Sequence, residues 1–242
     1  MNRNDNIYDL LNEYLDIGEE GICLLEEQID SDTQLEYFEC SKNEGKTQSA
    51  EEVFRQKHLI FDQSTSVDHK KKILVQLASL EDVEAYRTIE KYLKQPNSKL
   101  YEWAYLALQE SRLLLESKFL EENKVLITTG LGGKGLKLRY FIVMFTSDGS
   151  NLTELQKKII SSELKYNLGR KGAEIEYIDY DEGFASILTV VPIRIPVQKM
   201  FDKVIKECNE FGDFLFNDFI ISNVKVLNQE EIRELLSINN II

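Results

Sequence analysis

The sequence has few cysteines, few prolines and no long apolar run. Its 242 residues include three cysteines, at positions 23, 40 and 208, and three prolines. The cysteines form no Cys-x-x-Cys pair, so we expect reduced thiols rather than a disulfide framework. No apolar stretch approaches the roughly 18 residues that a membrane-spanning helix needs. The acidic N-terminus lacks the regions of a signal peptide. These features predict a cytoplasmic protein without a membrane partner.

Basic residues are scarce in the first part of the chain. The net charge is −13, and residues 1–70 alone hold 17 acidic and 6 basic side chains. A phosphate backbone or an acidic lipid surface would be repelled there, because both bind proteins largely through Lys and Arg. We therefore expect no nucleic-acid or membrane partner and an attraction to basic proteins. The alternative is that the acidity serves only solubility.

Recognisable catalytic and metal-binding sets are also missing. His58 and His69 are the only histidines, and no further ligand lies at metal-binding spacing, so we expect no metal or other cofactor. No Ser or Cys has the surroundings of a nucleophile elbow. Asp179, Asp181 and Glu182 cluster at a predicted hairpin turn, and an exposed turn is an unsuitable place for paired carboxylates to do acid–base work. The sequence favours a protein that is not an enzyme.

Helical periodicity dominates the first half of the chain. Residues 1–48 are predicted to be an acidic, loosely ordered arm, with one apolar helical stripe between Ile7 and Leu15 and a polar linker from Cys40. Residues 49–123 are predicted to be an all-helical domain. The expected helices span 51–60, 68–79, 82–94 and 99–117.

Two of these segments are alike. Residues 69–80 align with residues 99–110 at a shift of about 30 residues. Ile73 then falls on Trp103, Leu74 on Ala104 and Leu77 on Ala107. The stretch VEAYRTIEKYLKQPNSKLYEWAYLALQES adds a helix, a Pro-Asn turn and a second helix. Residues 68–117 thus resemble the helical hairpins of bacterial HEAT-repeat-containing proteins.

This resemblance implies a surface that binds other proteins. Two repeats are few for a free-standing solenoid, so we expect the helical hairpins to pack on the C-terminal half. Tyr101 and Tyr105 are one helical turn apart and are the candidate partner-binding patch.

The pattern changes to that of strands after residue 123. Strands are expected at 124–129, 138–146, 173–180, 184–191 and 219–227. Helices are expected from an Asn151–Glu154 capping box, from Pro196 at the first helical position, and over 229–236. The order β-α-β-β-α-β after one extra strand predicts a ferredoxin-like domain over 124–242, so the whole chain is assigned to the α+β class. Both faces of 138–146 are apolar, so the helical half, the extra hairpin or another subunit should cover the second face.

The sequence GLGGKG precedes that strand. Gly130, Gly132 and Gly135 match the G-x-G-x-x-G pattern, but a strand follows where a dinucleotide-binding motif needs a helix. Gly133 and Lys134 do not complete a P-loop. Two interpretations stay open. The glycines form a flexible hairpin tip, or their N–H groups bind an anion with Lys134 and nearby Lys137 and Arg139.

Three functions follow from these patterns. The first is a non-enzymatic interaction or scaffold protein with a protein partner. The second is a regulatory domain that binds an anionic small molecule at the glycine-rich hairpin. The third is RNA binding through the sheet, because EGFASILT (182–189) weakly resembles the RNP1 motif of RNA-recognition domains, although it lacks the basic residue and one aromatic ring. Homo-oligomerisation stays open.

Overall fold

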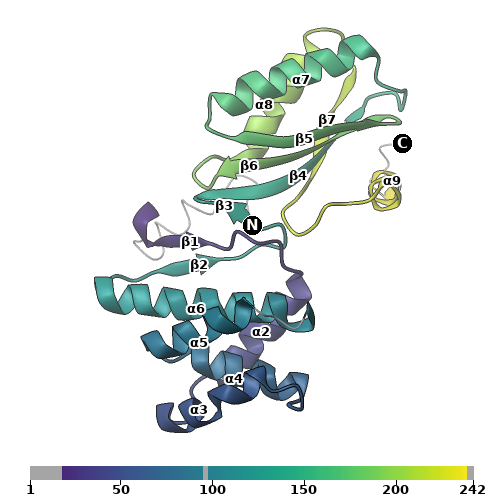
Figure 1. Cartoon of the computed structure of the whole chain (residues 1–242). Helices are drawn as coiled ribbons and strands as arrows, with labels where there is room; N and C mark the ends of the chain where they lie inside the picture. Colours follow the sequence, from purple (N-terminus) through teal and green to yellow (C-terminus); the bar gives the residue numbers. More distant parts are fainter. Residues whose placement is uncertain (1–17, 95–97, 239–242) are drawn as a thin grey trace. The chain divides into compact units, whose positions relative to one another are not determined.

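The computed structural model describes residues 18–94 and 98–238 (Figure 1). The chain divides into two units. We name residues 18–25 and 29–128 the helical unit, and residues 26–28 and 129–238 the sheet unit. The chain is therefore a mixed α+β protein, with its helices mainly N-terminal and its antiparallel sheet C-terminal. The apolar stripe of 7–15 and the turn at Pro96 lie outside the described residues.

Polar caps determine where the helices of the helical unit begin. Asp30, Ser49, Ser66 and Asp82 each accept a hydrogen bond from backbone N–H groups of the first turn. The elements are η1 (Glu19–Gly21), β1 (Ile22–Leu24), α2 (Ser31–Glu44), α3 (Ala50–Gln56), η2 (Lys57–Phe61), α4 (Val67–Ala78), α5 (Val83–Leu93), η3 (Ser98–Leu100), α6 (Tyr101–Leu120) and β2 (Val125–Ile127). Of the four helices expected from periodicity, three are present as α4, α5 and α6, while the one expected over 51–60 is divided into α3 and the 3-10 helix η2.

Helix α2 belongs to the core of the helical unit. Its Tyr37 is fully buried, with its ring centroid 5.3 Å from that of Trp103. The Tyr37 hydroxyl donates to Glu110, and Ser41 donates to the same carboxylate at 2.7 Å. The expected arm over 1–48, with a linker from Cys40, therefore differs from the structure over 31–44. The helix is mostly polar and is held by one aromatic side chain, so its apolar periodicity is weak.

A short parallel pair of strands completes the helical unit. Strand β1 pairs with β2 in the register Ile22 to Val125. The strand expected over 124–129 is thus present but joins the helical unit rather than the larger sheet. The boundary between the units falls after Thr128, five residues later than the sequence predicts.

The sheet unit contains an antiparallel sheet in the strand order β7-β4-β6-β5. The short β3 pairs with the first residues of β4. The elements are β3 (Gly133–Lys134), β4 (Lys137–Thr146), α7 (Glu154–Gly169), β5 (Glu174–Asp181), β6 (Phe184–Pro192), α8 (Val197–Asn209), β7 (Leu215–Ser222) and α9 (Gln229–Ile238). Strand β7 begins four residues before the expected 219, because Leu215 already pairs with Thr146. No described helix is both long and apolar enough to cross a bilayer.

Helices cover both faces of this sheet, as the apolar pattern of β4 predicts. Helices α7 and α8 lie on one face, where Ile142 and Met144 are buried (Figure 1). Phe141 and Val143 point to the other face and pack with Ile232 of α9. Helix α9, which the sequence analysis did not consider as a cover, therefore packs on the second face together with Leu131 of the glycine-rich hairpin, one of the three covers that it left open.

The starts of α7 and α8 differ slightly from expectation. Thr153 and Gln156 form the capping box of α7, in place of Asn151 and Glu154. Asn151 and Thr153 are both residue types that cap helices. Gln156 follows Thr153 by three residues, and its side chain accepts a hydrogen bond from the Thr153 N–H, which completes the capping box. Pro196 is the N-cap of α8 rather than its first helical residue, and its side chain accepts no capping hydrogen bond.

Candidate functional site

The glycine-rich hairpin packs tightly against residue 26. Gly130, Gly132 and Gly133 are buried, and Gly132 has a φ of +65°. A Cβ atom at Gly132 would collide with the backbone oxygen of Glu26, so this close approach requires glycine. The N–H of Gly133 donates to the same oxygen at 3.2 Å, and the exposed Gly135 donates to the Glu26 carboxylate at 2.7 Å. The hairpin backbone thus already binds an anion, which is the carboxylate of Glu26.

The cations of the hairpin are also engaged. Lys134 and Lys137 contact the Glu174 carboxylate at 2.8 and 2.6 Å, and Arg139 makes two hydrogen bonds to Glu176 at 2.7 and 3.0 Å. Lys134 and then Lys137 lower the pKa of Glu174 to about 2. A free anion would have to displace these carboxylates.

The structure brings the predicted tyrosine patch together. The rings of Tyr101 and Tyr105 stack with centroids 6.4 Å apart, and Tyr101 is 38% exposed. Trp103 points inward instead, where its Nε1 donates to the carbonyl of Lys71 at 3.2 Å. One face of α6 is therefore a core face, and beside it the exposed Tyr101 stacks on Tyr105, which is partly buried against the core.

The segment that resembles RNP1 lies on the sheet face beneath α9. Phe184 and Leu188 of this segment are 4% and 7% exposed and pack in one cluster with Ile232 and Leu236. An RNA base would have to replace α9 to stack on this face.

The reactive side chains form no evident catalytic set in the described part of the chain. His, Cys, Asp and Glu residues do not gather there in threes that could hold a metal ion. All three cysteines are free, and burial raises the pKa of Cys208 to about 12. A thiol with this pKa is a poor nucleophile at neutral pH.

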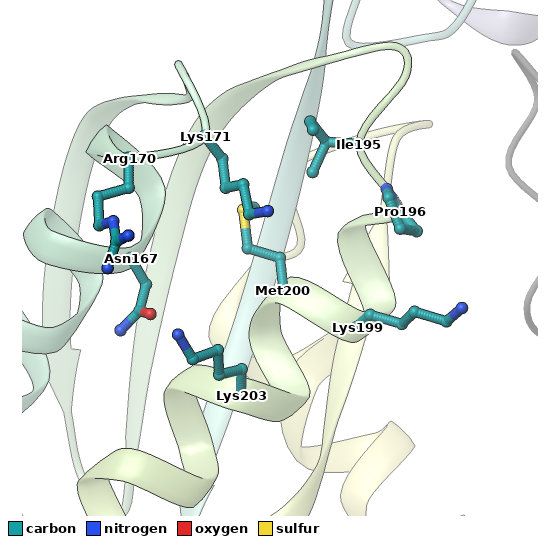
Figure 2. Close-up of a pocket in the computed structure, with 8 residues that line it drawn as sticks. All are labelled: Asn167, Arg170, Lys171, Ile195, Pro196, Lys199, Met200 and Lys203. Atoms are coloured by element: carbon teal, nitrogen blue, oxygen red, sulfur yellow. The ribbon is translucent and has the colours of Figure 1, made fainter.

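A pocket of about 410 Å³ lies between the end of α7 and the start of α8 (Figure 2). Four of its eight lining residues are cationic and none is acidic, in a chain of net charge −13. The lining residues are Asn167, Arg170, Lys171, Ile195, Pro196, Lys199, Met200 and Lys203. Of two other hollows of similar volume, one has a polar lining with three acidic residues and the other a mostly apolar lining. Among these three, the pocket between α7 and α8 is the one with a predominantly cationic rim.

Chain direction explains why these residues meet. Strands β4 and β6 are antiparallel, so the helices that follow them run in opposite directions and the end of α7 lies beside the start of α8. Gly172, with a φ of +73°, turns the chain from α7 into β5 and leaves Arg170 and Lys171 at the pocket rim. Lys199 and Lys203 are one turn apart on α8.

The cations form a rim around an apolar floor. Arg170, Lys171, Lys199 and Lys203 are exposed, whereas Met200 is 6% exposed. Within the described residues, Lys171 and Lys199 form no ion pair, while Lys203 contacts a glutamate at 3.3 Å. Figure 2 shows Lys171 and Lys203 extending toward the space between the helices, and Lys199 pointing away. Arg170 lies against Tyr166 of its own helix, where its Nη1 donates to the tyrosine hydroxyl at 2.9 Å. Of the cations that face the pocket, Lys171 is thus the one without an ion pair among the described residues.

Asn167 is the buried polar group of the pocket, at 5% exposure. Its Nδ2 donates to the backbone oxygen of Glu163 at 3.0 Å and to the carboxylates of Glu163 and Glu207. Burial and the adjacent Glu207 raise the pKa of Glu163. Figure 2 shows Oδ1 of Asn167 on the side that faces the pocket.

The sequence analysis missed this pocket. A signal was present, since Gly-Arg-Lys-Gly ends one helix, and two lysines at i and i+4 begin the other after a proline. Placing the two segments together requires the strand pairing, which the sequence pattern alone does not give.

Comparisons with known proteins add little. No family model matches the chain, and neither does any curated protein. Among solved structures, the chain is similar to "a putative transposase" from Deinococcus radiodurans R1, with 14% identity and a TM-score of 0.36. That match covers 45% of this chain and 95% of the other. A likeness at this level supports no conclusion about this chain.

Proposed function

We propose that this chain is a non-enzymatic binding protein whose sheet unit binds a small organic anion between α7 and α8. The observation that carries this proposal is the convergence of Lys171 and Lys203 on a pocket that Arg170 also lines and that has no acidic lining residue. The pocket volume of about 410 Å³ falls within the range of small-molecule sites. This proposal keeps the anionic ligand that the sequence suggests but places it away from the glycine-rich hairpin.

The strand order is compatible with a ferredoxin-like domain. The elements β4, α7, β5, β6, α8 and β7 follow the β-α-β-β-α-β order, with both helices on one face. We therefore keep this topology as our proposal for the sheet unit. The fold itself does not assign a ligand, because one superfold hosts many functions.

Thermal unfolding with added organic anions tests the proposal. Glycerol phosphate should raise the melting temperature, because a ligand that binds only the folded state stabilises it. Arg170→Ala with Lys171→Ala should abolish the rise. Lys158→Ala is the matched control, because Lys158 is also exposed on α7 but does not line the pocket.

Salt provides a second readout. The pocket cations are exposed to solvent, where salt screens their charge. The ligand-induced rise in melting temperature should therefore become smaller as ionic strength increases from about 0.05 M to about 0.5 M. An equal rise in the double variant, or no rise with any organic phosphate or carboxylate, would rule out this site.

Protein docking on the helical unit is a second candidate function. The stacked pair Tyr101 and Tyr105 favours it, because Tyr101 is exposed and aromatic rings are common at protein interfaces. The resemblance of residues 68–117 to HEAT hairpins supports the same proposal. A partner that co-purifies with the chain should be lost when both tyrosines become alanine. It should remain with Phe119→Ala, a control on the same helix at 68% exposure.

A further inference from the structure

The orientation of the Asn167 amide follows from its neighbours. Its Nδ2 contacts one backbone oxygen and the carboxylates of Glu163 and Glu207. In a flipped amide, Oδ1 would face these oxygens, and two acceptors cannot form a hydrogen bond with each other. The Nδ2 group, which donates, therefore takes this position. The contacts on Nδ2 therefore fix Oδ1 on the pocket side, where Figure 2 shows it.

The pocket thereby contains a fixed acceptor. Asn167 is 5% exposed, and no hydrogen bond reaches its Oδ1 from the described residues. Binding is therefore more favourable for a ligand whose hydrogen-bond donor reaches this oxygen. It is less favourable for a ligand that covers the oxygen with an apolar group.

Resting on the proposed function, we infer that Asn167 determines the ligand specificity of the pocket. The ligand is an organic anion that also carries a hydroxyl or amine hydrogen-bond donor. Its anionic group lies at Lys171, its carbon skeleton lies over Met200, and its donor binds Oδ1 of Asn167. Glu163 and Glu207 are positioning residues, because they act on the ligand through the amide.

The pair glycerol phosphate and propyl phosphate tests this inference. The two share charge and chain length, and only the first has hydroxyl donors. In isothermal titration of the wild-type chain, glycerol phosphate should bind about tenfold more tightly, because its hydroxyl adds one hydrogen bond to Oδ1 of Asn167. Equal binding of the two would overturn the inference but leave the proposed function intact. Failure of both to bind would remove the proposed function itself.

Two variants assign the preference to the amide. Asn167→Leu keeps the side-chain size and should bind both phosphates equally. A hydroxyl preference that persists in this variant would overturn the inference. Glu207→Gln keeps Asn167 but lets the neighbouring side chain donate as well as accept, so the amide can flip and the preference should fall. If Asn167→Leu fails to fold, the ligand pair on the wild-type chain still decides the question.

Discussion

The carboxylate of Glu26 accepts a hydrogen bond from the backbone N–H of Gly135, 109 residues away in the sequence, at 2.7 Å. The same residue accepts a second bond through its backbone oxygen from Gly133. The GLGGKG hairpin is therefore a place where two distant segments approach closely. Its glycines have a packing role in addition to any role in binding.

Gly132→Ala should destabilise the sheet unit by about 2 kcal/mol or more. The change adds a left-handed backbone cost of roughly 1–2 kcal/mol to a collision with the oxygen of Glu26. Gly169→Ala is the control, because a Cβ there meets nothing within 4 Å and its φ is not positive. Urea unfolding of both variants measures the difference. Equal stabilities of the two variants would show that the hairpin backbone can shift to accommodate a Cβ atom at residue 132.

Stability should fall at acid pH through Glu174. Lys134 and Lys137 lower the pKa of its carboxyl from 4.5 to about 2, so the charged form is favoured in the folded state. This contribution is complete above about pH 4.5 and is lost as the pH falls toward about 2. Glu174→Gln should flatten the pH dependence in this window. The effect should be small and weaker at high salt, because the group is exposed.

Cys208 should resist thiol reagents in the folded protein. It is fully buried, and burial raises its pKa to about 12. Cys23 and Cys40 are half-buried and should react first, though more slowly than a free thiol, because burial also raises their pKa values. Mass spectrometry of alkylated peptides at about pH 8 distinguishes the three sites. Rapid labelling of Cys208 without denaturant would contradict the packing of α8.

Tyr37→Phe should destabilise the helical unit by about 2 kcal/mol. The change removes a buried hydroxyl that donates to the Glu110 carboxylate, and hydrogen bonds to charged groups contribute roughly 1.5–3 kcal/mol. Ser41→Ala removes the second donor to this carboxylate but lies nearer the surface, so its effect should be smaller. Thermal unfolding of both variants checks the order. A neutral Tyr37→Phe would mean that α2 is held by packing alone.

Local pattern predicted most elements, and long-range pairing accounts for the failures. Helix α5 has strong apolar periodicity, and every core position of the 69–80 and 99–110 alignment is buried. Helix α2 was missed because its contacts are with residues distant in sequence, such as that of Tyr37 with Glu110, 73 residues away. The partner of β2 was also beyond reach, since three-residue strands carry no pairing information.

The candidate site shows the same limit. Spacing identified the glycine-rich hairpin because its residues are consecutive, and it identified the tyrosine pair because i and i+4 residues meet on any helix. The basic pocket joins residues 167–171 with 195–203, and only the sheet topology brings these together. The contact of the Glu26 carboxylate with the hairpin could not be predicted either, because Glu26 is distant from the hairpin in the sequence.

The parallel pairing of Ile22 with Val125 has a consequence for biosynthesis. Strand β1 emerges from the ribosome early but has no partner until the chain has been extended past β2. Helices α2 to α6 are made in between, so they can pack before this loop of about one hundred residues closes. During synthesis, the packing of helices α2 to α6 can thus precede the pairing of β1 with β2. A released chain that ends shortly before residue 125 should already protect the helices from proteolysis while leaving β1 open to cleavage.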